Sequence, residues 1–224
     1  MAAILRVYGI MLLKGMGQTL LMTLLTLVIA TIIGMIFGLM NVGHSRVLNL
    51  IGPVYVDAIR GVPLIVLAYF VFFGIPAGMQ GMGMKGFRLS ALQAGTIALS
   101  LNCGAYMAEI IRAGIQSVDI GQMEAGRSLG LPYWKTMRKI ILPQAIRTMI
   151  PSIINQFIIT VKDTSILSVI GFPELVLAAK NVQAGTFKSF ETWTIVGIMY
   201  LIVITILSYL AKMVERRVNR GVKR

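Results

Sequence analysis

The side chains of this sequence that could do chemistry are polar and charged groups placed inside long apolar stretches. Lys162 and Asp163 are adjacent within the stretch 146–170. In the same stretch, hydroxyl and amide side chains recur at every fourth residue: Thr148, Ser152, Gln156, Thr160, Thr164 and Ser168. Residues four apart lie on neighbouring turns of a helix, so these side chains would form one polar ridge. Such a ridge favours non-covalent chemistry, the binding of a polar solute or of another helix.

The ridge therefore has two interpretations, a solute path and a set of polar contacts between helices. A charged group at the centre of a bilayer costs about 2.5–3.5 kcal/mol, so the ridge should face protein or water. Lys162 and Asp163 point about 100° apart and are poorly placed to pair with each other. Asn102 lies deep in another apolar stretch, where an unmatched amide is costly. We expect Asn102, Asp163 and Thr164 to contact a solute.

Other polar or small residues favour structural roles. Glu109 and Arg112 are three residues apart on one helical face, so we expect an ion pair. Cys103 lies in an apolar run and is expected to be a small buried side chain. Small residues at four-residue steps let helices approach closely, which predicts helix packing at Ala30, Gly34 and Gly38.

Covalent and metal chemistry are disfavoured by what the sequence contains. One cysteine and one histidine, Cys103 and His44, cannot supply a metal cluster or an internal disulfide. No nucleophile and base stand in a recognisable arrangement, so no catalytic residue is expected. The sequence also has no Gly-Lys dipeptide and hence no GxxxxGK phosphate loop. We expect a protein that is not an enzyme, with no cofactor and no metal of its own.

The composition is that of an integral membrane protein. Of the 224 residues, 57% are hydrophobic and 13% are charged, whereas soluble domains carry about 25% charged residues. A membrane-spanning helix needs about 20 apolar residues. The sequence predicts an all-α protein with helices over about 19–40, 53–75, 89–111, 146–170 and 192–212.

The positive charges favour one orientation of these five helices. The net charge is +13, but the cations sit between apolar runs, which disfavours nucleic acid as a partner. With the C-terminus inside, the inner segments hold 13 Lys and Arg residues and the outer segments 6. Cytoplasmic loops carry the excess of positive charge. We therefore expect an extracytoplasmic segment 1–18, a transmembrane domain 19–212 with a cytoplasmic loop 113–145, and a basic cytoplasmic tail 213–224.

The cytoplasmic loop has the signals of two short helices. Asp119 is a plausible helix cap, and Gly130 suits a left-handed helix stop. Pro132 suits the first position of a second, amphipathic helix, and Pro143 is expected to interrupt the helical pattern before the fourth span. Two partners fit this segment, an anionic lipid surface and another protein. The small pair Ala125–Gly126 slightly favours protein, because small residues permit close approach.

The same loop resembles the signature loop of the permease subunits of bacterial ABC importers. That motif is Glu-Ala-Ala, three residues, Gly, nine residues, Ile, one residue, Leu-Pro. It is matched with its spacing by Glu124, Ala125, Gly126, Gly130, Ile140, Leu142 and Pro143. Gly126 replaces the second alanine and keeps the position small. The stretches 55–64, 102–118, 121–130, 142–146 and 162–171 are similar to the polar amino acid branch of this family, while Val62 and Leu67 depart from its usual threonine and glutamine.

The resemblance implies a type I importer permease with five core helices in a bacterial cell membrane. It implies that the loop is the coupling helix seated on a cytoplasmic ATPase dimer, which would bind ATP and Mg. It also implies a second permease subunit, identical or not, an extracytoplasmic solute-binding protein and an amino acid substrate. The alternative is an ATP-independent channel or secondary transporter for a small polar solute, which would also use charges inside the membrane.

Overall fold

The computed structural model describes residues 1–43 and 46–219, and within them the chain is helical with no strand. His44 and the last five residues of the basic tail lie outside the described residues. The helices in chain order are α1 Ala2–Met40, α2 Leu48–Gly61, α3 Leu64–Tyr69, η1 Phe70–Gly74, α4 Ile75–Gly81, α5 Ala91–Gln116, α6 Ile120–Ser128, α7 Tyr133–Thr136, η2 Met137–Ile141, α8 Leu142–Asp163, η3 Thr164–Ile170, α9 Leu175–Thr186 and α10 Ser189–Asn219.

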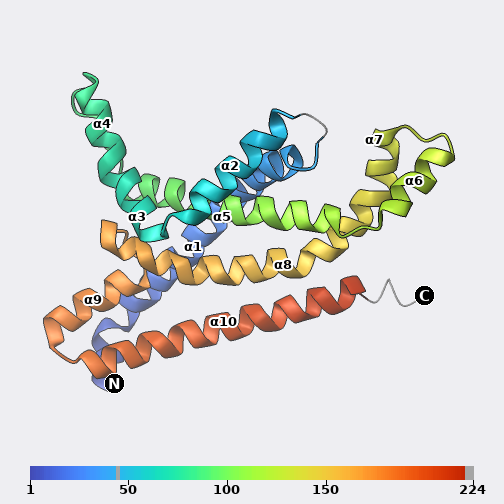
Figure 1. The fold of residues 1–224 in the computed structure, drawn as a ribbon. Coiled ribbons are helices and arrows are strands. Elements are labelled where there is room, and N and C mark those ends of the chain that lie inside the picture. The colour runs from blue at the N-terminus through green and yellow to red at the C-terminus, as the bar shows by residue number, and fades with distance from the viewer. Residues whose placement is uncertain (44–45, 220–224) are drawn as a thin grey trace.

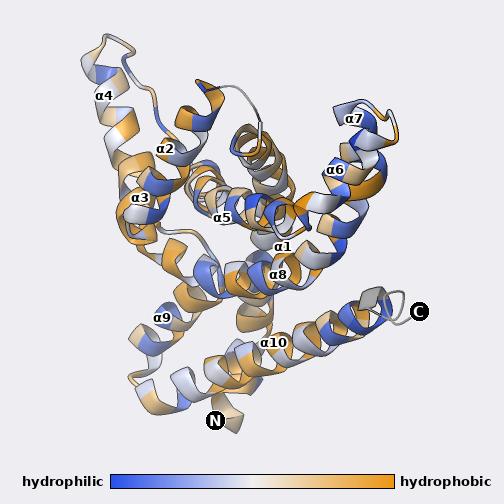
Figure 2. Ribbon diagram, turned by 45° about the vertical axis from the view of Figure 1, so that its right-hand side comes forward, coloured by the Kyte–Doolittle hydropathy of each residue, from blue (hydrophilic) through white to orange (hydrophobic). Residues whose placement is uncertain are grey.

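Five helical stretches of the described chain are long and apolar enough to cross a membrane, as the composition predicts. They are Ala2–Met40, Leu64–Gly81, Ala91–Gln116, Tyr133–Ile170 and Ser189–Arg217. Figure 2 shows hydrophobic residues along much of α1 and α10. The described chain is therefore all-α, with five stretches able to cross a membrane.

The first helix begins at Ala2 rather than at Thr19, where the charge-free stretch begins. Its first turns are not a free extracytoplasmic segment in structural terms, because they are held by other helices. Ile4, Leu12 and Met16 are buried in one cluster with residues of α9 and α10. The charges of Arg6 and Lys14 interrupt the apolar sequence, so the first turns of this helix were not predicted as part of the span.

The prediction that residues 53–75 form a single spanning helix was wrong. The chain leaves helical geometry at Val62, whose φ and ψ are −103° and 129°. The ring of a proline disfavours helical geometry in the residue before it, so Pro63 explains this break. A new helix then begins at Leu64, and the membrane-crossing stretch is Leu64–Gly81.

Proline bends two other helices without ending them. The π-helical turns η1 and η2 lie immediately before Pro76 and Pro143, each two residues ahead of its proline. A proline clashes with the carbonyl four residues earlier, and a π turn widens the helix at that point. The predicted interruption at Pro143 is therefore a widened turn, and the helical stretch Tyr133–Ile170 is continuous.

Helices α1 and α5 pack closely through the small residues that the sequence singled out. A Cβ added at Gly34 would lie 2.5 Å from the Cβ of Met107, and one at Gly38 would lie 2.9 Å from the carbonyl oxygen of Ala108. Ala30 is fully buried beside Cys103, which is 1% exposed. The predicted packing role of these residues and the burial of Cys103 are confirmed.

The hairpin of α6 and α7 and the N-terminus lie at opposite ends of the molecule. In Figure 1, α6 and α7 lie at the same end as the C-terminal end of α10, and the N-terminus lies at the other end with the turn between α9 and α10. The five spans thus carry the chain from one side to the other. The start of α1 and the last described turn of α10 therefore lie at opposite ends, as an odd number of crossings requires.

The close approach of α1 and α5 gives a first prediction. Gly34→Ala should lower stability by about 1–3 kcal/mol, because the added methyl group overlaps Met107. Gly17→Ala in the same helix is the matched control, since a Cβ there meets nothing within 4 Å. Thermal unfolding of both purified variants in detergent checks the expectation. Equal melting temperatures would show that the packing at Gly34 is not tight.

Candidate functional site

The hairpin of α6 and α7 is built by local capping. The Asp119 carboxylate accepts a hydrogen bond from Gly121 N at 2.6 Å and so caps α6, as predicted. At the other end, Gly130 has φ +79°, and its N–H donates to the Arg127 carbonyl at 3.0 Å. Leu131 N–H donates to the Gly126 carbonyl at 3.2 Å. This pair of bonds is a Schellman motif, which needs a left-handed residue and so favours glycine at position 130.

Gly126 is the point where the two helices of the hairpin touch. A Cβ there would lie 2.5 Å from Thr136 Cγ2 and 3.2 Å from Ile140 Cδ1. Thr136 is fully buried. The departure of this position from alanine therefore has a local reason, since the space that an alanine methyl would occupy is filled by Thr136.

The hairpin is anchored to the membrane helices by an apolar cluster. Ile115 of α5, Met137 and Ile141 of η2, and Ala145 and Met149 of α8 are its buried members. Among the motif residues, Ile140 and Leu142 pack against this cluster, whereas Pro143 is exposed. A displacement of the hairpin would therefore be transmitted to α5 and α8.

One helix of the hairpin presents the motif to its surroundings. Glu124 and Ala125 of α6 are exposed, while the neighbouring Gly126 is buried against α7. Large apolar side chains are exposed beside them: Ile120 at 75%, Leu129 at 82% and Trp134 at 78%. Exposed apolar groups on the same hairpin as an exposed carboxylate favour a protein partner.

The contact at Gly126 gives a second prediction. Gly126→Ala should destabilise the hairpin by about 1–3 kcal/mol through overlap with Thr136. Thr136→Ala should relieve the overlap, so the double variant should recover much of the loss. A double-mutant cycle on thermal stability measures this coupling. Strictly additive effects of the two substitutions would contradict the contact.

A second candidate site is a polar cavity among α2, α3, α5 and α8. It has a volume of about 490 Å³. Its walls are Arg60, Gly61, Val62, Pro63, Leu64, Asn102, Tyr106, Gln156, Ile159 and Asp163. The structure thus brings Asn102 and Asp163 together, as expected for two solute contacts, although they are distant in sequence.

Thr164 does not line this cavity. Its side chain is fully buried, and its Oγ1 donates to the Val161 carbonyl at 2.7 Å. Thr160 is also buried and donates to the Gln156 carbonyl at 2.8 Å. The residues of the polar ridge therefore fall into two groups. Gln156 lines the cavity, whereas Thr160 and Thr164 bond within their own helix and pack against neighbours.

The amide side chains that line the cavity have hydrogen-bonding atoms without a partner in the described part of the protein. Asn102 is 7% exposed and its amide has no hydrogen-bond partner within the described residues. Gln156 Nε2 lies 3.9 Å from Cys103 Sγ, a weak contact that leaves its amide oxygen free. Because both amides line the cavity, a solute that fills it would gain these hydrogen bonds.

The cavity also holds opposite charges. The guanidinium carbon of Arg60 lies 5.1 Å from the centre of the Tyr106 ring, a cation–π contact. Asp163 has no ion-pair partner within the described part of the chain. The neighbouring Lys162 lines a different groove with Trp193 and Tyr200. The expected divergence of Lys162 and Asp163 is confirmed.

Arg60 lines the cavity without having been predicted as a site residue. The missing information was the break at Val62 and Pro63, which ends α2 beside the cavity. Helix α2 is tied to α5 because Tyr55 Oη donates to the Leu101 carbonyl at 2.8 Å. Burial, with a smaller electrostatic contribution from Cys103, raises the pKa of Tyr55 to about 12, so it stays protonated as the donor.

Two features named from the sequence prove to lie outside the cavity. Arg112 Nε donates to Glu109 Oε2 at 3.0 Å, which confirms the predicted ion pair. Leu67, which stands where relatives often have glutamine, is 7% exposed in an apolar cluster with Met22 and Leu99. No titratable or thiol groups gather in a way that could hold a metal ion in the described residues.

The described chain has five helical stretches able to span a membrane, a cavity lined by charged and amide side chains, and a short helical hairpin at one end. These features fit a membrane transport subunit. A family model described as "binding-protein-dependent transport system inner membrane component" matches residues 30–220. The chain belongs to this family and is a multi-pass inner-membrane permease subunit.

Curated relatives agree over nearly the whole chain. The glutamine transport system permease protein GlnP of Escherichia coli (strain K12) is 36% identical over 209 residues, which are 93% of each chain. The arginine transport system permease protein ArtQ of Bacillus subtilis (strain 168) is 35% identical over 207 residues, or 92% of each chain.

Solved structures show the same fold. A crystal structure of an amino acid ABC transporter with histidines matches with a TM-score of 0.87 and 38% identity, and the match covers 94% of this chain and 95% of that one. An inward-facing methionine ABC transporter, MetNI, matches with a TM-score of 0.76 over 93% of this chain and 96% of that one. Its 20% identity supports the type I importer permease fold alone.

Proposed function

We propose that this chain forms the translocation path of an ATP-driven importer of polar amino acids and couples that path to a separate ATPase. The observation that carries the proposal is the joining of two sites by one helical stretch. Tyr133–Ile170 is continuous and includes η2 of the hairpin at one end and Asp163 of the cavity at the other. The relatives named for glutamine and arginine transport support an amino acid as the substrate.

The cavity fits the two charges that every amino acid carries at its α-carbon. Arg60 can bind the α-carboxylate through charge-assisted hydrogen bonds, and Asp163 can bind the α-ammonium group. The amides of Asn102 and Gln156 are left for a polar side chain. Because neither charge has an ion-pair partner among the described residues, a zwitterion would satisfy both at once.

Helix α6 is the part of the hairpin that contacts the ATPase in this proposal. Its exposed Glu124 and Ala125 face outward, whereas α7 is turned toward the membrane domain. ATP binding closes the ATPase dimer and draws the two hairpins of a permease dimer together. The third to fifth spans then rotate, and the cavity changes from inward-facing to outward-facing access.

The proposal assigns the remaining components to other chains. ATP and Mg are bound by the ATPase dimer, and an extracytoplasmic binding protein delivers the amino acid. A second permease subunit, identical or related, completes the path. The N-terminus is outside and the C-terminus inside, which the charge count supports. An ATP-independent channel or secondary transporter would have no use for a docking hairpin with exposed apolar groups.

The coupling role gives a third prediction. Gly130→Trp should abolish ATP-driven amino acid uptake while leaving membrane insertion intact, because a bulky residue at φ +79° strains the turn. Gly130→Asn is the matched control, since asparagine tolerates left-handed geometry. Uptake into liposomes by the reconstituted complex, with binding protein and ATP, measures the effect. Full uptake by Gly130→Trp would show that the turn does not couple.

The solute role gives a fourth prediction. Asp163→Asn should reduce amino acid uptake by at least about tenfold, because it removes a charge-assisted contact with the ammonium group. Lys162→Gln, one residue away and facing a different groove, should have a much smaller effect. Binding-protein-stimulated ATP hydrolysis should persist in both variants. Equal uptake by the two variants would contradict the assignment of Asp163 to the path.

A further inference from the structure

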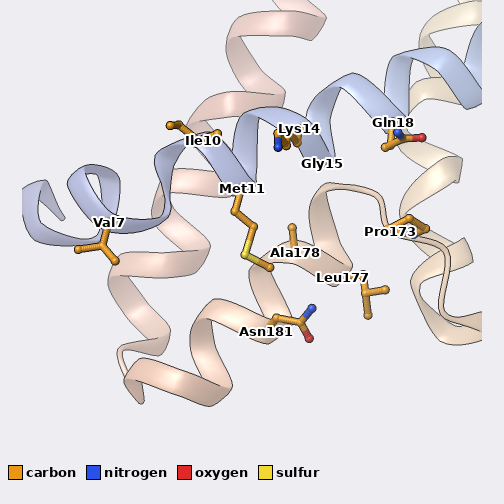
Figure 3. A pocket seen from close by; sticks show the side chains of 10 residues that line it. All are labelled: Val7, Ile10, Met11, Lys14, Gly15, Gln18, Pro173, Leu177, Ala178 and Asn181. Atoms are coloured by element: carbon orange, nitrogen blue, oxygen red, sulfur yellow. The ribbon is translucent and has the colours of Figure 1, made fainter.

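A groove between α1 and α9 lies apart from the solute cavity and has no part in the function proposed above. Its volume is about 560 Å³, and its polar side chains are Lys14 and Gln18 of α1 and Asn181 of α9. Figure 3 shows these three residues on the two helices that wall the groove, with Met11 and Leu177 among its apolar lining.

The two walls of the groove are held at a fixed spacing. A Cβ added at Gly15 would lie 3.0 Å from the Cα of Leu175 and 3.1 Å from the Cβ of Ala178, so the two helices are in close contact there. Leu175 N–H donates to Thr19 Oγ1 at 3.3 Å. The buried Glu174 carboxylate caps α9 by accepting from Val176 N at 2.8 Å and Leu177 N at 2.7 Å.

The polar side chains of this groove have no partners of their own. Lys14, Gln18 and Asn181 make no hydrogen bond or ion pair within the described residues. The nearby Lys180 differs, because its Nζ donates to Ser168 Oγ at 3.0 Å. Three side chains able to donate hydrogen bonds, one of them cationic, therefore meet at one groove and remain available to a ligand.

The position of Lys14 along α1 sets its depth in the membrane. The 26 residues from Gly15 to Met40 carry no charge. At 1.5 Å per residue they are about 39 Å long, and the hydrocarbon core is about 30 Å thick. Even at a tilt of about 40° this charge-free length is enough to cross the core, which allows Lys14 to lie at the level of the headgroups.

We propose that this groove binds the phosphate of an anionic phospholipid, with Lys14 as the cation and the amides of Gln18 and Asn181 as hydrogen-bond donors. The lipid belongs to the outer leaflet under the orientation proposed above. A phosphate diester offers a negative charge and several acceptor oxygens, which match an ammonium group and two amides. The apolar side chains beside them favour an amphiphile over a free anion.

Lipid retention by the purified complex tests the proposal without any transport measurement. The permease is purified with its ATPase partner in mild detergent, supplied with phosphatidylglycerol or phosphatidylcholine of the same acyl chains, and examined by native mass spectrometry. Wild type should retain phosphatidylglycerol in preference to phosphatidylcholine. Lys14→Gln should lower that retention about tenfold, as expected for the loss of a charge-assisted contact.

Two variants control for folding and for general charge effects. Lys14→Arg keeps the charge and should keep the lipid. Lys188→Gln removes another cation, in the turn between α9 and α10 at the same end of the molecule, that does not line the groove, and it should leave retention unchanged. Equal losses in Lys14→Gln and Lys188→Gln would overturn the proposal.

Other outcomes would replace the lipid with a different occupant. Complete displacement of phosphatidylglycerol by millimolar inorganic phosphate would indicate a free-anion site and overturn the proposal. A changed number of permease subunits in Lys14→Gln, seen in the same spectra before lipid is added, would indicate that a second copy covers the groove. If the tests of amino acid transport fail while the lipid is retained as expected, the lipid site is supported independently of the solute path.

Discussion

The hydrocarbon core of a bilayer offers no hydrogen-bond partner to a polar side chain, and this constraint decides where each polar group of the protein lies. Many hydroxyl groups in the spans meet it by bonding to their own helix. Thr23 donates to the Thr19 carbonyl at 2.8 Å, and Thr160 to the Gln156 carbonyl at 2.8 Å. The polar groups that do not meet it in this way, among them Asn102 and Asp163, are therefore informative.

Glu174 shows how a carboxylate can be buried under the same constraint. It is fully buried beyond the end of the fourth span, and burial raises its pKa to about 7, although two backbone N–H groups and Tyr200 oppose the shift. Glu174 accepts hydrogen bonds from the backbone at the start of α9 and from Tyr200 of α10. It therefore stabilises α9 and is not a solute contact in this proposal. Burial of a charge marks a solute site only where the charge also borders a cavity, as Asp163 does.

The sequence predicted the parts of the structure that depend on local chemistry. Periodic apolar runs place the helices, and the hairpin is built by the Asp119 cap at the start of α6 and the left-handed Gly130 at its end. The two prolines that matter were harder to interpret. Pro63 ends a helix and Pro143 does not. The outcome is not set by the proline itself, because Pro53 and Pro151 also lie inside helices without ending them.

The candidate cavity was only partly predictable for the same reason. Asn102 and Asp163 could be named because polar groups in apolar runs are costly, but position alone could not separate Asp163 from Thr164. These neighbours diverge because α8 tightens into η3 at Thr164, which turns that hydroxyl back toward the Val161 carbonyl. Arg60 joins the cavity only because α2 stops at Gly61. The cavity is therefore defined by where two helices change geometry.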